Sequence, residues 1–377
     1  MNCLSDSFAN LMLISDKQHF FSEQLVQWNR LHNKRMMPWK NEKDPYKVWL
    51  SEIILQQTRV DQGLEYYKRF IKKYPVIGRL AAADDNEVFK LWEGLGYYSR
   101  CKNLLVTARY IAFEQKGKFP GTHGEILKLK GVGPYTAAAI ASFAFGLPYA
   151  VVDGNVVRVL SRFFGISIPA DSNKGKKYFA ALAQKLLGKN DPALYNQAIM
   201  DFGATICKPK LPLCLQCPLQ KECTAFKKNM IAVLPVKEKA LQRKKRSFFF
   251  IIAEYGDKIY AKKRTEKDIW QNLWEFISVE VQEPLNAEDF IRSNEYKKII
   301  PAGKVKAISG VFRQQLTHRD VEAVFIQVKL KKVLKSREYM AVQKAELGKL
   351  AFPRLINHFL EQGNFTAEPE LKEFSQR

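Results

Sequence analysis

Two neighbouring stretches decide the fold of this chain: Leu129-Lys130-Gly131-Val132-Gly133-Pro134-Tyr135-Thr136-Ala137 and, shortly downstream, Val151-Val152-Asp153-Gly154-Asn155. The first stretch predicts a helix, a tight glycine turn and a second helix. Such a turn can present bare backbone N–H groups to a phosphate. Asp153 stands at the start of the next predicted helix, where it can be an N-cap and a functional carboxylate at once. The backbone N–H groups and the dipole at this helix start should favour its ionised form. The pattern fits a site that works on DNA, and it also fits a plain helical hairpin.

The composition indicates a polyanionic partner. The chain has 377 residues, of which 46% are hydrophobic, enough for two or three domains with buried cores. Its net charge of +23 and pI near 9.6 make nucleic acid the first candidate partner, and a basic protein without such a partner is the alternative. No apolar window of about 18 residues exists, so we expect no membrane span. The polar residues 1–10 lack the features of a signal peptide, and we expect 1–15 to be a flexible leader.

The N-terminal two-thirds of the chain is predicted to be helical. An amphipathic helix is expected over 16–35, and a second one from Tyr46 to Phe70. In the second helix, Glu52 lies opposite the apolar face, among neutral polar and aliphatic side chains. That surrounding is typical of the lining of a cleft, although an ordinary surface position is an equally good interpretation.

A glycine- and tyrosine-rich loop and several further helices complete this part. The loop Gly94-Leu95-Gly96-Tyr97-Tyr98-Ser99-Arg100 suits contact with a DNA backbone and stacking on bases, and it also fits a packed turn. The remaining helices are expected near residues 137–145, 156–164, 177–187 and 195–206.

The pattern changes from helices to strands after the last cysteine. Residues 226–246 form a basic linker. Strands are then predicted near 248–252, 258–262, 305–311 and 321–328, followed by a helix near 353–361. We therefore expect an α+β domain over 247–363 and a flexible tail over 364–377.

Four of the six cysteines, Cys207, Cys214, Cys217 and Cys223, fall in one short segment with the spacing C-x6-C-x2-C-x5-C. Thiolates so close in sequence can converge on one metal centre. Zinc also uses a two-residue gap between cysteines, so spacing alone leaves zinc open. Either centre would hold a basic loop in a fixed shape.

Taken together, the glycine hairpin, Asp153 and the cysteine spacing resemble the endonuclease III superfamily of DNA glycosylases, over most of residues 16–225. Within it the chain resembles the adenine DNA glycosylases of the MutY type. The resemblance implies an all-α helix-hairpin-helix domain with an iron–sulfur loop, followed by an α+β Nudix-like domain. The segments that carry it are Pro38-Trp39, Asp44-Pro45-Tyr46, 51–60, 94–100, Tyr195-Asn196-Gln197-Ala198, 272–276 and Leu316-Thr317-His318.

The resemblance also implies the reaction and its residues. Adenine mispaired with 8-oxoguanine, or with guanine, would be flipped out of duplex DNA and removed, and the cysteines would hold a [4Fe-4S] cluster. Glu52 would be the general acid at adenine N7, Asp153 would stabilise the oxocarbenium-like sugar, and Asn155 and Tyr135 would orient both. The positions matching the adenine pocket are Arg35, Met37, Trp39 and Gln197. The positions matching the lesion side are Leu55, Gln57, Thr58, Tyr97, Leu316, Thr317 and His318. Gly131 and Gly133 would bind a DNA phosphate through a cation held at the hairpin.

Some positions separate subfamilies or depart from the family pattern. Tyr135 stands where relatives with lyase activity carry a Schiff-base lysine, which implies a monofunctional enzyme. The usual Pro-Trp-Arg is Pro38-Trp39-Lys40 here, and Thr317 replaces a serine but keeps its hydroxyl. Residues 274–300 lack the acidic magnesium-binding helix of Nudix pyrophosphohydrolases, so we expect no such activity.

Three rival interpretations remain at this stage. They are a pyrimidine glycosylase with lyase activity, a catalytically silent DNA-binding module, and a nucleotide pyrophosphohydrolase. We expect a monomer that acts on DNA in a bacterial cytoplasm, associated with the nucleoid.

Overall fold

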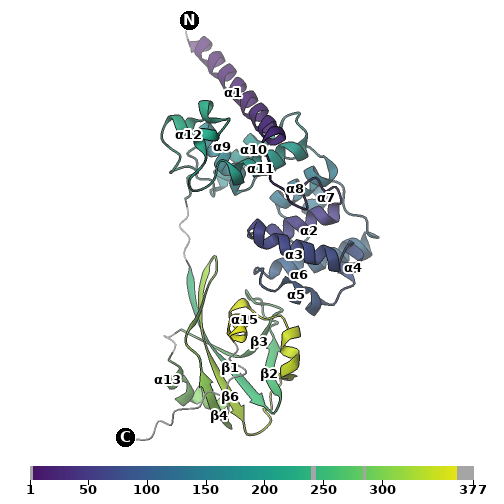
Figure 1. Ribbon diagram of the computed structural model, residues 1–377, viewed down its shortest axis with the longest axis vertical. Helices are drawn as coiled ribbons and strands as arrows, with labels where there is room; N and C mark the ends of the chain where they lie inside the picture. Colours follow the sequence, from purple (N-terminus) through teal and green to yellow (C-terminus); the bar gives the residue numbers. More distant parts are fainter. Residues whose placement is uncertain (1–2, 239–242, 283–285, 363–377) are drawn as a thin grey trace. The chain divides into compact units, whose positions relative to one another are not determined.

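The computed structural model describes residues 3–238, 243–282 and 286–362, and for residues 3–15 the backbone alone. The chain forms two compact units (Figure 1). The helical unit comprises Met1–Ala82 and Asn103–Ala240, and the sheet unit comprises Ala83–Lys102 and Leu241–Arg377. The sequence predicts a helical domain of two lobes over 16–225, whereas in the structure Ala83–Lys102 groups with the sheet unit.

The helical unit is built from short helices around an aromatic core. In chain order they are α1 (Cys3–Leu31), α2 (Pro45–Leu55), α3 (Val60–Lys73), α4 (Ile77–Ala81), α6 (Ser99–Arg109, which starts in the sheet unit), the π-helix η1 (Tyr110–Glu114), α7 (His123–Leu127), α8 (Pro134–Phe145), α9 (Gly154–Phe164), α10 (Asn173–Leu187), α11 (Pro192–Thr205), the 3-10 helices η2 (Cys214–Gln216) and η3 (Gln220–Glu222), and α12 (Thr224–Lys227). Helix α1 packs on α9, α10 and α11, with the ring centroids of Trp28 and Phe202 5.0 Å apart. None of the described helices is long and apolar enough to cross a membrane.

Two helix boundaries differ from the sequence prediction. The expected helix from Tyr46 to Phe70 is two helices, because the chain turns between Leu55 and Val60, where Gln57 has a φ of 58°. Helix α1 begins at Cys3 rather than near Asp16, and it ends at Leu31 rather than at residue 35. Asn33 accepts a hydrogen bond from the Arg35 backbone N–H at 3.1 Å, and this local bond holds the loop that follows the helix.

The sheet unit contains one mixed sheet with helices on both faces. Its elements are α5 (Asp85–Trp92), β1 (Lys244–Tyr255), β2 (Lys258–Lys263), β3 (Trp274–Val281), α13 (Ala287–Arg292), α14 (Asn294–Ile299), β4 (Gly303–Ile308), β5 (Phe312–Gln315), β6 (Arg319–Leu330), β7 (Met340–Gln343), the 3-10 helix η4 (Lys344–Lys349) and α15 (Arg354–Glu361). The strand order is β4-β6-β1-β3-β2-β7, with β5 also paired to β6. Strands β1 and β6 are parallel and the other pairings are antiparallel. The α+β prediction for this region is confirmed.

The two faces of this sheet are covered by different helices. Helices α13 and α14 pack against one face, where Phe290 stacks on Phe249 with ring centroids 4.2 Å apart. Helix α15 covers the other face, where Phe359 stacks on Phe325 at 4.1 Å.

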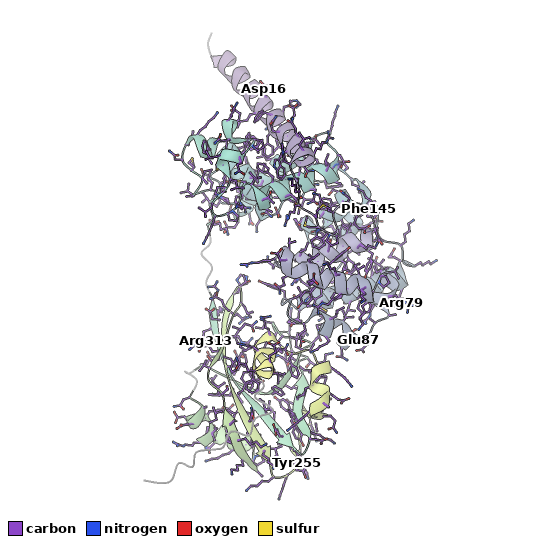
Figure 2. All side chains as sticks on the ribbon, in the orientation of Figure 1. Asp16, Arg79, Glu87, Phe145, Tyr255 and Arg313 are labelled. Carbon is purple, nitrogen blue, oxygen red and sulfur yellow. The ribbon has the colours of Figure 1, made fainter. Side chains whose placement is uncertain are left out.

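The segment Ala83–Lys102 joins the sheet unit through side chain to backbone hydrogen bonds. Helix α5, on which Figure 2 labels Glu87, carries Lys90 near its end. Lys90 donates from Nζ to the Leu350 carbonyl oxygen at 2.9 Å, and Glu93 accepts the Phe352 backbone N–H at 2.8 Å. These contacts explain why a helical segment belongs to the β-rich unit.

Candidate active site

One cavity of about 410 Å³ in the helical unit is lined by all four residues predicted to be catalytic. Helix α2 contributes Glu52, helix α8 contributes Tyr135, and the start of α9 contributes Asp153 and Asn155. Segments far apart in sequence therefore bring two carboxylates to the same enclosed space.

Glu52 is a buried acid with a strongly perturbed pKa. Its side chain is 5% exposed, which excludes the surface interpretation of this position. Burial raises the pKa of Glu52 to about 7; a hydrogen bond with Tyr135 opposes that rise, and the charge of Asp153 adds to it. Glu52 can therefore hold a proton near neutral pH. Burial beside these two carboxylates also raises the pKa of Tyr135, which keeps the phenol protonated.

Asp153 is both an N-cap and a member of the cavity. Its Oδ1 accepts the Val156 backbone N–H at 2.7 Å, and its Oδ2 accepts the Asn155 side-chain amide at 2.7 Å. These donors favour the ionised form, as the sequence argument expects. Burial acts in the opposite direction and outweighs them, so the pKa of Asp153 is raised rather than lowered. The expected direction of that pKa shift was wrong.

Arg158 connects this carboxylate to the cysteine segment. Its Nη2 donates to Asn155 Oδ1 at 2.8 Å and to the Gly203 carbonyl at 2.6 Å, and its Nε donates to the Cys207 carbonyl at 2.7 Å. Because Arg158 can only donate, it turns the Asn155 oxygen toward itself and the Asn155 amide group toward Asp153. The sequence argument did not identify Arg158, although an arginine one helical turn after a functional Asn is a recognisable pattern.

The same cavity collects most of the predicted pocket residues. Of the described residues, its lining includes Arg35, Met37, Trp39, Leu55, Thr58 and Gln197. Gln57, whose φ is positive, is not part of this lining.

Asp201 also lines this cavity, and the sequence argument missed it. Its side chain is fully buried and accepts hydrogen bonds from Arg35 Nη1 and Asn33 Nδ2, each at 2.8 Å. Lys40, the residue that departs from the family pattern, lies 3.5 Å from Asp201 and donates to the Arg35 carbonyl at 3.1 Å. An acid inside the apolar stretch of helix α11 was the available clue, since buried charges are almost always paired.

The glycine hairpin has the predicted tight turn. Gly131 has a φ of 80°, and a Cβ there would lie 2.8 Å from Asn103 Cβ. Gly133 is the N-cap of α8, with Pro134 in the first turn. Thr107 on α6 donates to the Lys130 carbonyl at 2.9 Å and so anchors the turn to the preceding helix.

Two predicted lesion-side residues meet within the sheet unit. The hydroxyls of Tyr97 and Thr317 form a short hydrogen bond. Tyr97 has a φ of 47° and is 42% exposed. Leu316 and His318 flank Thr317: the Leu316 N–H donates to the Arg319 carbonyl at 2.7 Å, and the His318 carbonyl accepts the Lys244 N–H at 3.0 Å.

The four clustered cysteines surround one small cavity in the helical unit. Arg162, buried on α9, lies beside them: its Nη1 is 3.6 Å from Cys207 Sγ and donates to the Lys208 carbonyl at 2.8 Å. Burial raises the pKa of Cys217 to about 12. A positive centre is thus needed to hold this thiol as a thiolate.

Comparison with known proteins identifies the class first. Residues 50–189 match the family described as "HhH-GPD superfamily base excision DNA repair protein", and residues 248–362 match the Nudix domain family. The fold is similar to a solved structure of a thermostable thymine-DNA glycosylase, with a TM-score of 0.53 and 31% identity, covering 57% of this chain and 99% of that one. The fold and site thus define a helix-hairpin-helix DNA glycosylase with a Nudix-like second domain.

Relatives then narrow the class to one family. The chain is 36% identical over 258 residues to the adenine DNA glycosylase of Buchnera aphidicola subsp. Schizaphis graminum, covering 68% of this chain and 74% of that protein. It is 42% identical over 214 residues to the human adenine DNA glycosylase, covering 54% of this chain and 39% of the human protein. The chain belongs to the adenine DNA glycosylase family.

Proposed function

We propose that this protein removes adenine paired with 8-oxoguanine, or with guanine, from duplex DNA by hydrolysis of the N-glycosidic bond. The observation that carries the proposal is the cavity in which Glu52, with a pKa of about 7, shares the lining with Asp153. Breaking this bond requires a protonated leaving base and a stabilised sugar cation, two demands that a pair of carboxylates in different environments can meet.

Each catalytic group has a distinct role in the proposal. Glu52 donates its proton to adenine N7, and the Tyr135 hydroxyl fixes the orientation of that carboxyl group. Asp153 faces the positive charge that develops on the sugar. Asn155 holds the Asp153 carboxylate by its 2.7 Å hydrogen bond, so that little reorganisation is needed as charge develops.

We propose that the enzyme is monofunctional. The hairpin position from which a lysine could attack the sugar is Tyr135, whose phenol has a raised pKa and remains a weak nucleophile. A borohydride trapping assay on the same substrate should yield no covalent enzyme–DNA complex. A trapped complex would instead favour the pyrimidine glycosylase and lyase interpretation.

For the opposite strand, we propose that Tyr97 and Thr317 read the 8-oxoguanine. The hydrogen bond between their hydroxyls supports this role, because it brings a stacking ring and a donor group together. Gln57, Thr58 and Leu55 are proposed to occupy the gap left by the flipped adenine.

We propose a [4Fe-4S] cluster on Cys207, Cys214, Cys217 and Cys223. These four thiols line one cavity, which supports a single metal centre. A four-iron cluster takes one thiolate on each iron, so four cysteines would supply all of its protein ligands. The bound cluster would supply a rigid scaffold for the basic loop. Purified protein should contain iron and sulfide in about equal amounts, with zinc absent.

The hairpin and the charge support the remaining proposals. The Gly131–Gly133 backbone would hold a DNA phosphate through a bound cation, as the turn geometry allows. We propose that the protein acts as a monomer on DNA in a bacterial cytoplasm, in association with the nucleoid.

A single-turnover excision assay tests the function. Adenine is placed opposite 8-oxoguanine, guanine and cytosine, and we expect the order of rates to follow that list. Glu52→Gln should lower the rate by roughly 10²–10⁴-fold while leaving duplex binding unchanged. Glu65→Gln, at an exposed position of helix α3, is the matched control and should retain full activity. If Glu52→Gln lowers the excision rate by less than about tenfold, Glu52 is not the general acid.

A further inference from the structure

One end of the sheet in the sheet unit, the end opposite to Thr317, carries a basic surface. Strand β6 starts two residues after Thr317 and ends at Leu330. Its 12 residues are 11 steps apart from end to end, which corresponds to roughly 36 Å at about 3.2–3.4 Å per step. Figure 2 labels Arg313 and Tyr255, which lie toward opposite ends of this unit. Tyr255 directly follows Glu254, the β-sheet partner of Lys329.

Six exposed lysines gather at this far end: Lys298, Lys304, Lys329, Lys331, Lys332 and Lys335. They come from helix α14, from strand β4, from the end of β6 and from the loop after it. No ion pair of the described residues involves any of them, and the nearby acid Glu338 is already paired with Lys262 at 3.2 Å. We refer to these six residues as the far-end lysine surface.

Two of these lysines lie directly beside each other on neighbouring strands. Lys304 on β4 and Lys329 on β6 are direct register partners, so their side chains share one face. Like charges at such positions destabilise an antiparallel pair. Lys331 continues the same edge, with its backbone N–H bonded to the Ala302 carbonyl at 3.0 Å. Glu254, the register partner of Lys329 on β1, is already engaged by Lys306 at 3.4 Å and Lys344 at 3.0 Å. A bound polyanion would relieve the remaining repulsion.

The distribution of the lysines favours a polymer over a single nucleotide. A cavity of about 600 Å³ at this end is lined by Lys298, Lys332 and Lys335. The other three members of the far-end lysine surface lie outside its lining. Lys304 and Lys329 point to the opposite face of the sheet from Leu330, which lines the cavity. One mononucleotide in the cavity would therefore leave half of these charges without a partner, whereas a duplex that passes over the end of the sheet could reach lysines on both faces.

We infer that the far-end lysine surface binds the backbone of undamaged duplex DNA. This goes beyond the proposed function, because it needs neither a lesion nor a flipped base. Duplex DNA presents regularly spaced phosphates, and Lys contacts to them are independent of sequence. The surface would hold DNA about ten base pairs from the lesion-reading loop, given a rise of about 3.4 Å per base pair.

The test measures binding of the full-length protein to an undamaged duplex of about 40 base pairs at several salt concentrations. Each phosphate contact contributes about 0.9 to the slope of log affinity against log salt. The triple variant Lys298→Gln, Lys332→Gln and Lys335→Gln should lower this slope by about 2 to 3. The control variant replaces Lys174, Lys176 and Lys177, exposed on α10, with the same loss of charge, and its slope should stay close to that of the parent.

Excision of adenine opposite 8-oxoguanine, measured at saturating enzyme, should be unchanged in the triple variant. Failure of the proposed function would abolish excision in the parent, which separates the two hypotheses. An unchanged slope in the triple variant would overturn the inference. So would an equal loss in the control, which would mean a bulk charge effect. A loss of binding to polyglutamate, with DNA binding intact, would assign the surface to an acidic protein and also overturn it.

Discussion

At the scale of single residues, the raised pKa of Glu52 suits this residue to donate a proton and also lowers the stability of the folded protein. Its pKa of about 7 in the folded protein lies above the ordinary value of 4.5. The folded state therefore retains the proton while the unfolded chain has lost it. The contribution of Glu52 to the free energy of unfolding is fully present below pH 4.5, and it is lost as the pH rises toward 7.

We predict opposite effects of Glu52→Gln on activity and stability. The raised pKa of Glu52 corresponds to about 3 kcal/mol of lost stability at pH 8, at about 1.4 kcal/mol per pKa unit. Glu52→Gln should therefore be inactive, and by up to that amount more stable than the parent at pH 8, with little difference at pH 4.5. Urea unfolding at both pH values measures this. Equal stability changes at the two pH values would contradict a raised pKa.

The same pKa predicts the pH dependence of the reaction. The acid form of Glu52 and the ionised form of Asp153 are both required. The single-turnover rate should therefore fall about tenfold per pH unit above about pH 7, and it should also fall in acid, where the raised pKa of Asp153 lets this carboxylate take up a proton earlier than an ordinary one. A rate that keeps rising through pH 8 would speak against Glu52 as proton donor. Saturating enzyme must be used, so that weaker DNA binding does not imitate the effect.

The Asp201 carboxylate neutralises two cations in the lining of the cavity, Arg35 and Lys40. It is fully buried, whereas Arg35 and Lys40 are 26% and 17% exposed. Loss of a hydrogen bond to a charged group typically costs about 1.5–3 kcal/mol, and the two cations left behind can reach solvent. We predict that Asp201→Ala lowers the free energy of unfolding by about that amount, and that Asp201→Asn, which keeps the shape, costs less. A thermal shift no larger than that of Glu65→Gln would show that the network contributes nothing.

At the scale of secondary-structure elements, the two glycines of the hairpin differ in whether they can be replaced by a residue with a Cβ. Gly131 has a φ of 80° and would place a Cβ 2.8 Å from Asn103 Cβ, while Gly133 has a φ of −98° and nothing within 4 Å. We predict that Gly131→Ala costs about 2 kcal/mol or more and weakens DNA binding. Gly133→Ala retains its backbone N–H and should resemble the parent. Similar losses in both variants would show that the turn conformation is not the deciding factor.

The success of sequence reasoning also differs from element to element. The hairpin, the N-cap Asp153 and the cysteine spacing are local patterns, so the elements that carry them were predictable. The break between α2 and α3 and the burial of Asp201 depend on tertiary packing, which periodicity does not report. The direction of the Asp153 pKa shift was missed for the same reason, because desolvation arises only in the folded cavity. The catalytic roles assigned to these residues stay predictions until tested.

At the scale of the whole molecule, lesion preference depends on the sheet unit in our proposal. Thr317 reaches the lesion-reading position through its hydrogen bond with Tyr97. We predict that deleting residues 247–377 reduces the rate advantage of adenine opposite 8-oxoguanine over adenine opposite guanine. Thr317→Val, which removes only the hydroxyl, should reduce the same ratio with no loss of folding. Unchanged ratios in both variants would exclude this unit from lesion reading.

The assignment of Ala83–Lys102 to the sheet unit has a consequence for protein synthesis. Phe89 on α5 is buried, with Lys263 over its ring at 5.9 Å, and Glu93 bonds to Phe352. These partners are translated long after α5, by roughly 10–50 s at about 5–20 residues per second. During that interval the Phe89 ring lacks its Lys263 contact and the Glu93 carboxylate lacks its Phe352 partner. Helix α5 can therefore reach its final contacts only after the strands of the sheet have been synthesised.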